Sequence, residues 1–183
     1  MTSKYKEILV VGLATAFAAG LAPQQARAHE LLYISIGDVT RAPIGWVDFC
    51  AEHTFECKVA PTAPRDVVLT NKTWTDLVRI NKWVNENVKP MTDMDHWGVV
   101  EKWSYPDDGY GDCEDYALLK RRMLTEAGWP REALLMTVVR EKSGDGHAVL
   151  TVKTDKGEFI LDNQETKIPV SYTHLTLPTK RIV

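Results

Sequence analysis

The spacing of hydrophobic and polar residues changes along the chain, first repeating with the period of a helix and later with that of a strand. Between Thr73 and Pro90 the apolar residues recur mostly at three- and four-residue steps, which predicts an amphipathic helix with Thr73 as its N-cap and Pro90 as its stop. We expect its apolar side chains to face the core: Trp74, Leu77, Val78, Trp83, Val84 and Val88. A second helix is predicted from Cys113 to Ala127, where Gly128 ends it.

Downstream of Pro130 the sequence is typical of β-strands separated by glycine-containing turns at 144–146 and 155–157. The three predicted strands are Leu134–Arg140, His147–Lys153 and one that begins at Glu158–Leu161. Helices followed by an antiparallel meander predict an α+β fold. The segments 29–70 and 91–112 have no clear period and several turn-forming residues, so we expect them to be irregular.

The first 28 residues have the three parts of a secretory signal peptide. Lys4 and Lys6 form a basic start, Ile8–Leu21 is an apolar run, and Ala26–Ala28 has the small-x-small form of a cleavage site. We therefore expect residues 1–28 to be removed and the mature protein to be periplasmic. The alternative is an uncleaved membrane anchor, although the apolar run is short for a membrane span.

The rest of the chain has the length of one domain, which we assign to residues 29–170. The last 13 residues, 171–183, differ from it in pattern, because their mixture of Thr, His, Leu and Pro extends neither a helix nor a strand cleanly. We interpret this tail as non-native, translated from adapter or assembly sequence.

The charge of the chain argues against a nucleic-acid partner. Its formal net charge is −3, and loss of the leader would make it more negative, because the leader carries Lys4, Lys6 and Arg27 but only one acid, Glu7. The sequence contains no basic stripe that could neutralise phosphates. We therefore expect no nucleic acid among its partners.

The three cysteines fall into two groups. Cys50 and Cys57 lie close together in the sequence, and we expect them to form a disulfide in an oxidising compartment. Cys113 remains unpaired and stands alone at the predicted start of a helix. An odd cysteine in an exported protein is a candidate reactive thiol, although most lone cysteines are buried and inert.

Cys113, His147 and Asp162 are the candidate catalytic residues. A helix start lowers the pKa of a thiol through the macrodipole and the unpaired backbone N–H groups. The acids around Cys113 have the opposite effect, so a protonated histidine or a cation must offset them. His147 follows a glycine turn at the start of a predicted strand, and Asp162 ends the next strand, where it could fix the imidazole tautomer.

Asp112, Glu114 and Asp115 surround the candidate nucleophile and are the candidate metal ligands. Grouped carboxylates next to a flexible acidic loop suit Ca²⁺ better than a transition metal, since no histidine or thiolate pair shares their spacing. The alternative is that these acids only cap the helix N-terminus, which is their commonest role there. The local pattern leaves both interpretations open.

Three motifs in order resemble the bacterial transglutaminase-like cysteine proteinases, the family of the LapG-like periplasmic proteases: Tyr110–Ala117, Gly146–Leu150 and Leu161–Asn163. The resemblance runs from about Ala42 to Ile168. It implies a papain- or transglutaminase-like core, with the nucleophile helix packed on an antiparallel sheet. It also implies a catalytic triad of Cys113, His147 and Asp162, and a Ca²⁺ site made by Asp112 and Glu114, with Asp115 as a further ligand.

The resemblance further implies a calcium-dependent cysteine endopeptidase that acts by an acyl-enzyme mechanism. Its substrate would be a surface or periplasmic protein, such as an adhesin whose cleavage controls biofilm attachment, and a membrane-bound regulator would be a partner. Two alternatives stay open. The same acyl-enzyme could be resolved by an amine, as in a transglutaminase, or the chain could be a non-catalytic calcium-dependent binding module.

Overall fold

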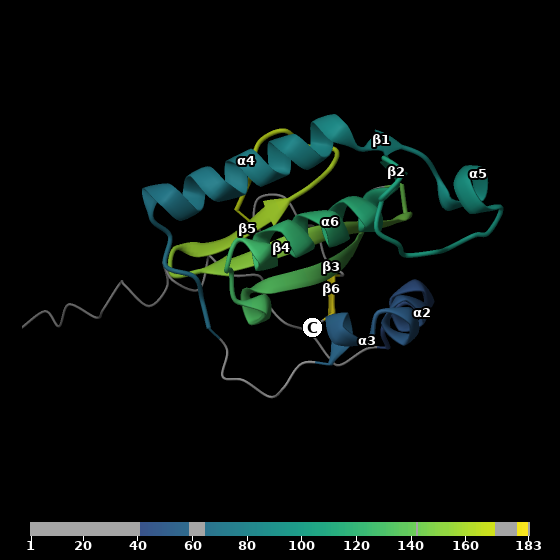
Figure 1. Ribbon diagram of the computed structural model, residues 1–183, viewed down its shortest axis with the longest axis horizontal. Helices are drawn as coiled ribbons and strands as arrows, with labels where there is room; N and C mark the ends of the chain where they lie inside the picture. The colour runs from purple at the N-terminus through teal and green to yellow at the C-terminus, as the bar shows by residue number, and fades with distance from the viewer. Residues whose placement is uncertain (1–40, 59–64, 142, 171–178, 183) are drawn as a thin grey trace, which may run out of the picture.

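The computed structural model describes residues 41–58, 65–141, 143–170 and 179–182 (Figure 1). The predicted signal peptide, residues 1–28, lies outside this part of the chain and so stays a prediction. Within the described ranges, no helix is both long enough and apolar enough to cross a membrane.

A four-stranded antiparallel sheet in the order β5-β4-β3-β6 forms one layer of the fold. Its first three strands in the chain are β3 (Leu134–Arg140), β4 (Gly146–Thr154) and β5 (Gly157–Leu161). Each matches a predicted strand to within one residue at its ends, so the predicted meander and the α+β fold class are confirmed. In the register of β4 with β5, Leu150 pairs with Leu161, which places Asp162 beside the start of β4.

The fourth strand, β6 (Thr179–Ile182), lies in the C-terminal tail and pairs with β3. The expectation that residues 171–183 extend no strand was therefore wrong for residues 179–182. A free strand edge can accept the backbone of an extended segment whatever its side-chain pattern, which is why the pattern did not reveal this strand. The foreign origin of the tail stays a prediction.

Two helices, α4 (Asn71–Asn87) and α6 (Cys113–Glu126), form the second layer, and α6 packs on β4 (Figure 1). The predicted N-cap of the first helix was three residues late. Thr70 is the N-cap, and Thr73 completes a capping box, because each of the two side chains bonds the backbone N–H of the other. The start of α6 at Cys113 agrees with the prediction, and Asp112 is its N-cap.

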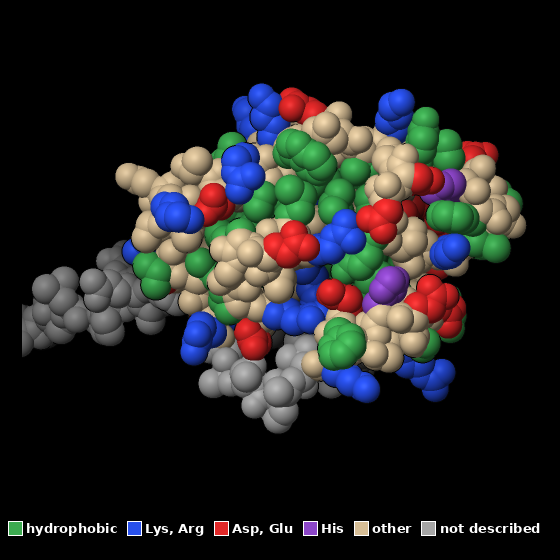
Figure 2. All heavy atoms as spheres, viewed as in Figure 1, with side chains coloured by type: hydrophobic (Ala, Val, Ile, Leu, Met, Phe, Trp, Pro, Cys, Tyr) green, Lys and Arg blue, Asp and Glu red, His purple; other side chains and the backbone are tan. Residues whose placement is uncertain are grey.

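The apolar face of α4 is only partly buried. Leu77, Val84 and Val88 lie in the core as expected, but 37% of Trp74, 42% of Val78 and 47% of Trp83 is exposed. Hydrophobic side chains therefore appear among charged ones on the surface of α4 (Figure 2). The core prediction was wrong for these three residues because α4 lies at the surface of the fold and buries only the side that faces α6 and the sheet.

The segment that was predicted to be irregular, 29–70, contains two helices: α2 (Ile44–Glu52) and α3 (Thr54–Cys57). Cys50 and Cys57 form a disulfide that ties these helices together, with their Cα atoms 5.5 Å apart. Glu56 in α3 accepts hydrogen bonds from Arg121 of α6 at 3.1 Å and from Arg131 at 2.6 Å. The disulfide-linked unit is thereby anchored to the helix that begins at Cys113.

Residues 91–112 were also expected to be irregular, yet they hold a short helix, α5 (Asp93–Trp97). Two-residue strands flank it, β1 (Lys89–Pro90) and β2 (Tyr110–Gly111), which pair in parallel. A 3₁₀ turn, η1 (Arg131–Ala133), leads from α6 into β3. The pairing of β1 with β2 holds the loop that carries α5 next to the start of α6.

Candidate active site

Cys113 is the first residue of α6, and its sulfur lies against the start of β4. The backbone N–H of Ala148 donates to Cys113 Sγ at 3.3 Å, and the thiol donates to Glu114 Oε2 at 3.2 Å. Because Ala148 directly follows His147, the contact between α6 and β4 brings the predicted nucleophile and the predicted base into one neighbourhood.

His147 and Asp162 form a buried pair behind the sulfur. His147 Nε2 lies 2.9 Å from Asp162 Oδ1, and only 6% of the histidine and 2% of the aspartate is exposed. The same Asp162 oxygen accepts the backbone N–H of Gln164 at 2.9 Å. A carboxylate bonded to one ring nitrogen fixes the tautomer of the imidazole. Because Nε2 bonds to Asp162, Nδ1 of His147 is the ring nitrogen that remains for proton transfer.

Cys113 and His147 both line a cleft of about 390 Å³. Gln164 and Glu141 line it beside the imidazole, where Gln164 Nε2 lies 3.5 Å and Glu141 Oε1 lies 3.9 Å from His147 Nδ1. The three residues that the sequence analysis proposed as a triad are thus brought together at one cleft, with Asp162 behind it.

Asn85, on α4, supports this arrangement and was missed in the sequence. Its side-chain N–H groups donate to the carbonyl oxygen of Asp162 at 2.9 Å and to that of Glu165 at 3.4 Å. It therefore holds the backbone of the loop that follows β5. An asparagine inside an amphipathic helix gives no sign of such a role, because its partners lie far away in the sequence.

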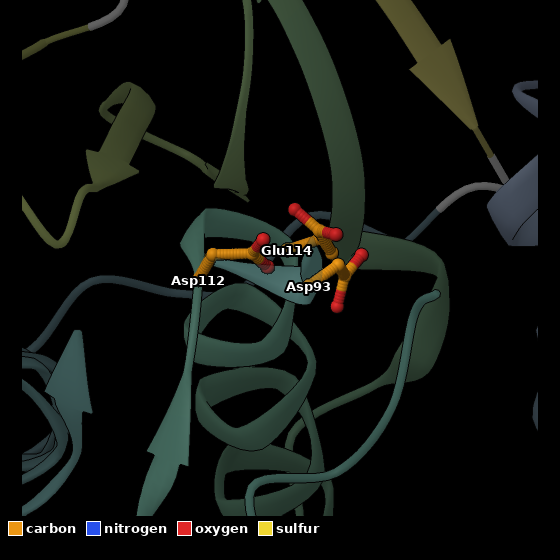
Figure 3. Close-up of side chains that lie close together, drawn as sticks. All are labelled: Asp93, Asp112 and Glu114. Carbon is orange, nitrogen blue, oxygen red and sulfur yellow. The ribbon is translucent and has the colours of Figure 1, made fainter. Parts of the chain in front are cut away.

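A cluster of three carboxylates stands next to the sulfur: Asp93, Asp112 and Glu114 each place one oxygen within 4.8 Å of the other two. Figure 3 shows their carboxylates pointing toward one another at the start of α6. Asp93 opens α5, and only 4% of it is exposed. Asp93 could not be recognised as a member of this cluster from the sequence, because it lies about twenty residues before the other two acids and only the pairing of β1 with β2 brings it near.

Asp115, the third predicted ligand, does not belong to this cluster. Its Oδ1 accepts the backbone N–H of Ser104 at 2.7 Å, so the carboxylate is used to hold the loop before α6. It folds back over Gly111, where a Cβ atom would lie only 2.7 Å from the Asp115 side chain. Among the described residues, Asp93 and not Asp115 completes the group of three acids with Asp112 and Glu114.

A profile of the family described as bacterial transglutaminase-like cysteine proteinase BTLCP matches residues 36–176. The chain belongs to this family. No curated protein matches it. Among solved structures it is similar to Legionella pneumophila LapG with calcium bound, at 28% sequence identity and a TM-score of 0.50, over 56% of this chain and 60% of LapG. An EGTA-treated LapG structure matches with 28% identity and a TM-score of 0.48, over 55% of this chain and 57% of that one.

When no cation is bound, burial and the neighbouring carboxylates oppose ionisation of the Cys113 thiol. Burial, and after it the Glu114 carboxylate, raise the pKa of Cys113 well above its ordinary value. Burial and then Asp112 raise the pKa of Glu114 to about 9, and burial also raises the pKa of Asp112. The expected lowering of the thiol pKa by the helix start is therefore outweighed by desolvation and by the neighbouring acids.

The three clustered acids fit a hard cation. Among the described residues, none of them forms an ion pair with Lys or Arg within 4 Å, and Asp112 Oδ1 is buried without a hydrogen-bond partner. An all-oxygen set of carboxylates is the donor set that Ca²⁺ prefers. Asp93, Asp112 and Glu114 are therefore the residues that would hold Ca²⁺, and the bound charge would remove the repulsion that now disfavours the Cys113 thiolate.

The buried acids predict a pH-dependent stability that calcium suppresses. Without a cation, the pKa of Glu114 is raised from 4.5 to about 9, and burial raises that of Asp115 from 3.8 to about 8. A group whose pKa is higher in the folded state than in the unfolded state stabilises the folded state. This contribution is complete at a pH below the pKa of the unfolded state, and it is lost as the pH rises through the pKa of the folded state. We expect the free energy of unfolding in EGTA to fall by at least about 1 kcal/mol between pH 5 and pH 9.

Denaturant unfolding in EGTA and in excess calcium, followed across this pH range, measures the effect. Calcium should reduce the slope by removing the contribution of Glu114, and Glu114→Gln should reduce it in EGTA, because the amide does not titrate, whereas the contribution of Asp115 remains in both cases. A curve in EGTA that rises with pH, or one that calcium leaves unchanged, would contradict the prediction.

Proposed function

We propose that this protein is an exported cysteine endopeptidase that cleaves a surface or periplasmic protein through a Cys113–His147–Asp162 acyl-enzyme mechanism. The observation that carries the proposal is the line of contacts from Cys113 Sγ, through the N–H of Ala148 next to His147, to the 2.9 Å bond between His147 Nε2 and Asp162. Membership of the cysteine proteinase family supports it.

In the proposed mechanism, His147 accepts the proton of the Cys113 thiol, and the thiolate attacks the carbonyl carbon of the scissile peptide bond. Cys113 lies at the first position of α6, where its backbone N–H has no partner within the helix and suits the developing oxyanion. The imidazolium then protonates the leaving amine, and water attacks the thioester with His147 as the base, which releases the acid and restores the thiol. Asp162 stabilises the imidazolium at Nε2 throughout.

The proposal includes dependence on Ca²⁺. It is supported by the cluster of Asp93, Asp112 and Glu114 beside the nucleophile and by the similarity to a LapG structure with calcium bound. The cation would act by neutralising the acids that border Cys113. Asp93 takes the place in this site that the sequence analysis assigned to Asp115.

The proposed location is the periplasm, after removal of residues 1–28. The disulfide between Cys50 and Cys57 supports an oxidising compartment, where such bonds persist. A surface adhesin is the proposed substrate and a membrane-bound regulator the proposed partner, both by analogy with the family. The chain spans about 60% of the length of LapG.

The test is incubation of the purified protein with candidate surface proteins, in calcium and in EGTA, followed by mass analysis of the products. Hydrolysis gives two fragments whose masses sum to that of the substrate plus one water, and we expect them only in calcium. A cross-linked product would instead indicate acyl transfer to an amine. Binding without any new product, together with a Cys113 that does not react with iodoacetamide, would favour a non-catalytic binding module and overturn the proposal.

A further inference from the structure

Lys120, on the third turn of α6, is an unusual lysine because it is entirely buried. None of its surface is exposed, and its Nζ has no hydrogen-bond partner among the described residues. A lysine in the core costs stability unless a negative charge compensates it, and apolar residues of similar length would pack there at no such cost. Lys120 lies on α6, the helix that begins at Cys113, so the position of its ammonium group relative to the active site matters.

The packing of α6 shows where the Lys120 side chain lies. Tyr116, one turn earlier on the same face, donates its hydroxyl to the carbonyl of Val88 at the end of α4, so this face of α6 lies against α4. Lys120 Nζ lies 6.0 Å from the centre of the Tyr116 ring. Long side chains on a helix lean toward its N-terminus, so the ammonium group is directed toward the end of α6 that holds the nucleophile.

The polar contacts of α4 lead from this region to Asp162, because the side chain of Asn85 donates to the Asp162 carbonyl at 2.9 Å. Burial lowers the pKa of Lys120 to about 7, and Asp162 is the charge that works against this effect. On the facing side of α4 the polar groups are the uncharged Asn81 and Asn85, whose Oδ1 atoms are buried and lack hydrogen-bond partners among the described residues. Lys120 and Asp162 are thus opposite charges in one water-poor interior, with amide groups beside them.

We propose that Lys120 is a positioning residue of the active site, whose ammonium group lies behind Asp162 and keeps that carboxylate ionised so that it can hold the His147 imidazolium. The inference rests on the proposed function, because it assigns a role within the same mechanism. Asn85 complements it by holding the Asp162 carbonyl at 2.9 Å.

Replacing Lys120 by Met removes the charge at nearly constant volume and leaves Asp162 without its counter-charge. A buried carboxylate that loses its cation takes up a proton at higher pH, and the neutral form cannot stabilise the imidazolium. We expect the rate of Cys113 alkylation by iodoacetamide, measured against pH in excess calcium, to shift to higher pH and to fall about tenfold at neutral pH.

Two variants separate this role from simple stabilisation. Leu124→Ala, one turn further along α6 and equally buried, should lower the unfolding midpoint without moving the pH profile of alkylation. Lys120→Arg keeps the positive charge and should keep the profile closer to that of wild type than Lys120→Met does. A wild-type profile in folded Lys120→Met, or a shift of the same size in Leu124→Ala, would overturn the proposal.

If Lys120→Met does not fold, the double variant Lys120→Met/Asp162→Asn decides the matter. Removing both charges leaves no unpaired ion in the interior, so we expect the double variant to fold and to unfold at a higher denaturant concentration than Lys120→Met. A double variant no more stable than the single one would show that the two groups are not coupled and would overturn the inference.

The same alkylation measurement separates the role of Lys120 from the proposed function. If wild-type Cys113 does not react with iodoacetamide at any pH in calcium, the proposed function fails, and the role of Lys120 fails with it. If the wild type reacts and Lys120→Met has the same pH profile, only the role of Lys120 is lost.

Discussion

Replacement of Cys113 by Ala is expected to reduce cleavage of a protein substrate by at least about 10⁴-fold, because the acyl-enzyme cannot form without the sulfur. The effect on folding should be small, since Cys113 is only partly buried and its sulfur makes two hydrogen bonds. The measurements are the rate of fragment formation in excess calcium and the midpoint of denaturant unfolding.

Cys113→Ser is the matched control for the shape of the site. The hydroxyl can take the place of the thiol, but it ionises far less readily, so this variant should be nearly as inactive as Cys113→Ala while it unfolds like the wild type. Cleavage by either variant within about tenfold of the wild-type rate would contradict the nucleophile assignment.

The second large effect is expected from the acid that only the fold revealed. Asp93→Ala removes one of the three clustered carboxylates, so the calcium concentration for half-maximal cleavage should rise at least about tenfold. Asp112→Ala and Glu114→Ala should act in the same direction, and EGTA should reproduce the loss in the wild type. The measurement is the rate of fragment formation during a calcium titration.

Asp107→Ala provides the comparison, because Asp107 lies in the same acidic loop but is exposed and paired with Arg122 at 3.0 Å. It should leave the calcium requirement unchanged. Asp115→Asn is expected to change stability more than the calcium requirement, since Asp115 bonds to the Ser104 backbone. If Asp115→Asn raised the requirement and Asp93→Ala did not, the original ligand set of Asp112, Glu114 and Asp115 would be the better one.

The strands were predicted well from the sequence because their pattern reflects a local requirement. β3 pairs with β4 along its whole length, and turns at Gly144 and Gly157 require the positive φ angles that glycine adopts easily. Alternation of apolar and polar residues with a period of two, and turns that contain glycine, can both be recognised within a few residues of sequence. The strand of the tail, β6, had neither signal and was missed.

The helices were predicted less well where burial depends on a distant partner. The period of α4 was recognisable, but which of its apolar residues are buried depends on how α4 meets α6, so the exposure of Trp74, Val78 and Trp83 could not be predicted. The short helices α2 and α3 are held by the disulfide and by bonds between Glu56 and two arginines. Such long-range ties leave no periodic trace in the sequence.

The sequence by itself determined the α+β class, the start of the helix at Cys113, and the order of the motifs that contain Cys113, His147 and Asp162, because these follow from local spacing and residue type. Only the tertiary structure decided which other groups surround them. Asp93 enters the acid cluster through the pairing of β1 with β2, and Lys120 is buried where α6 packs against α4. Electrostatic interactions act through space rather than along the chain, so the groups that tune a site can come from any element that folds beside it.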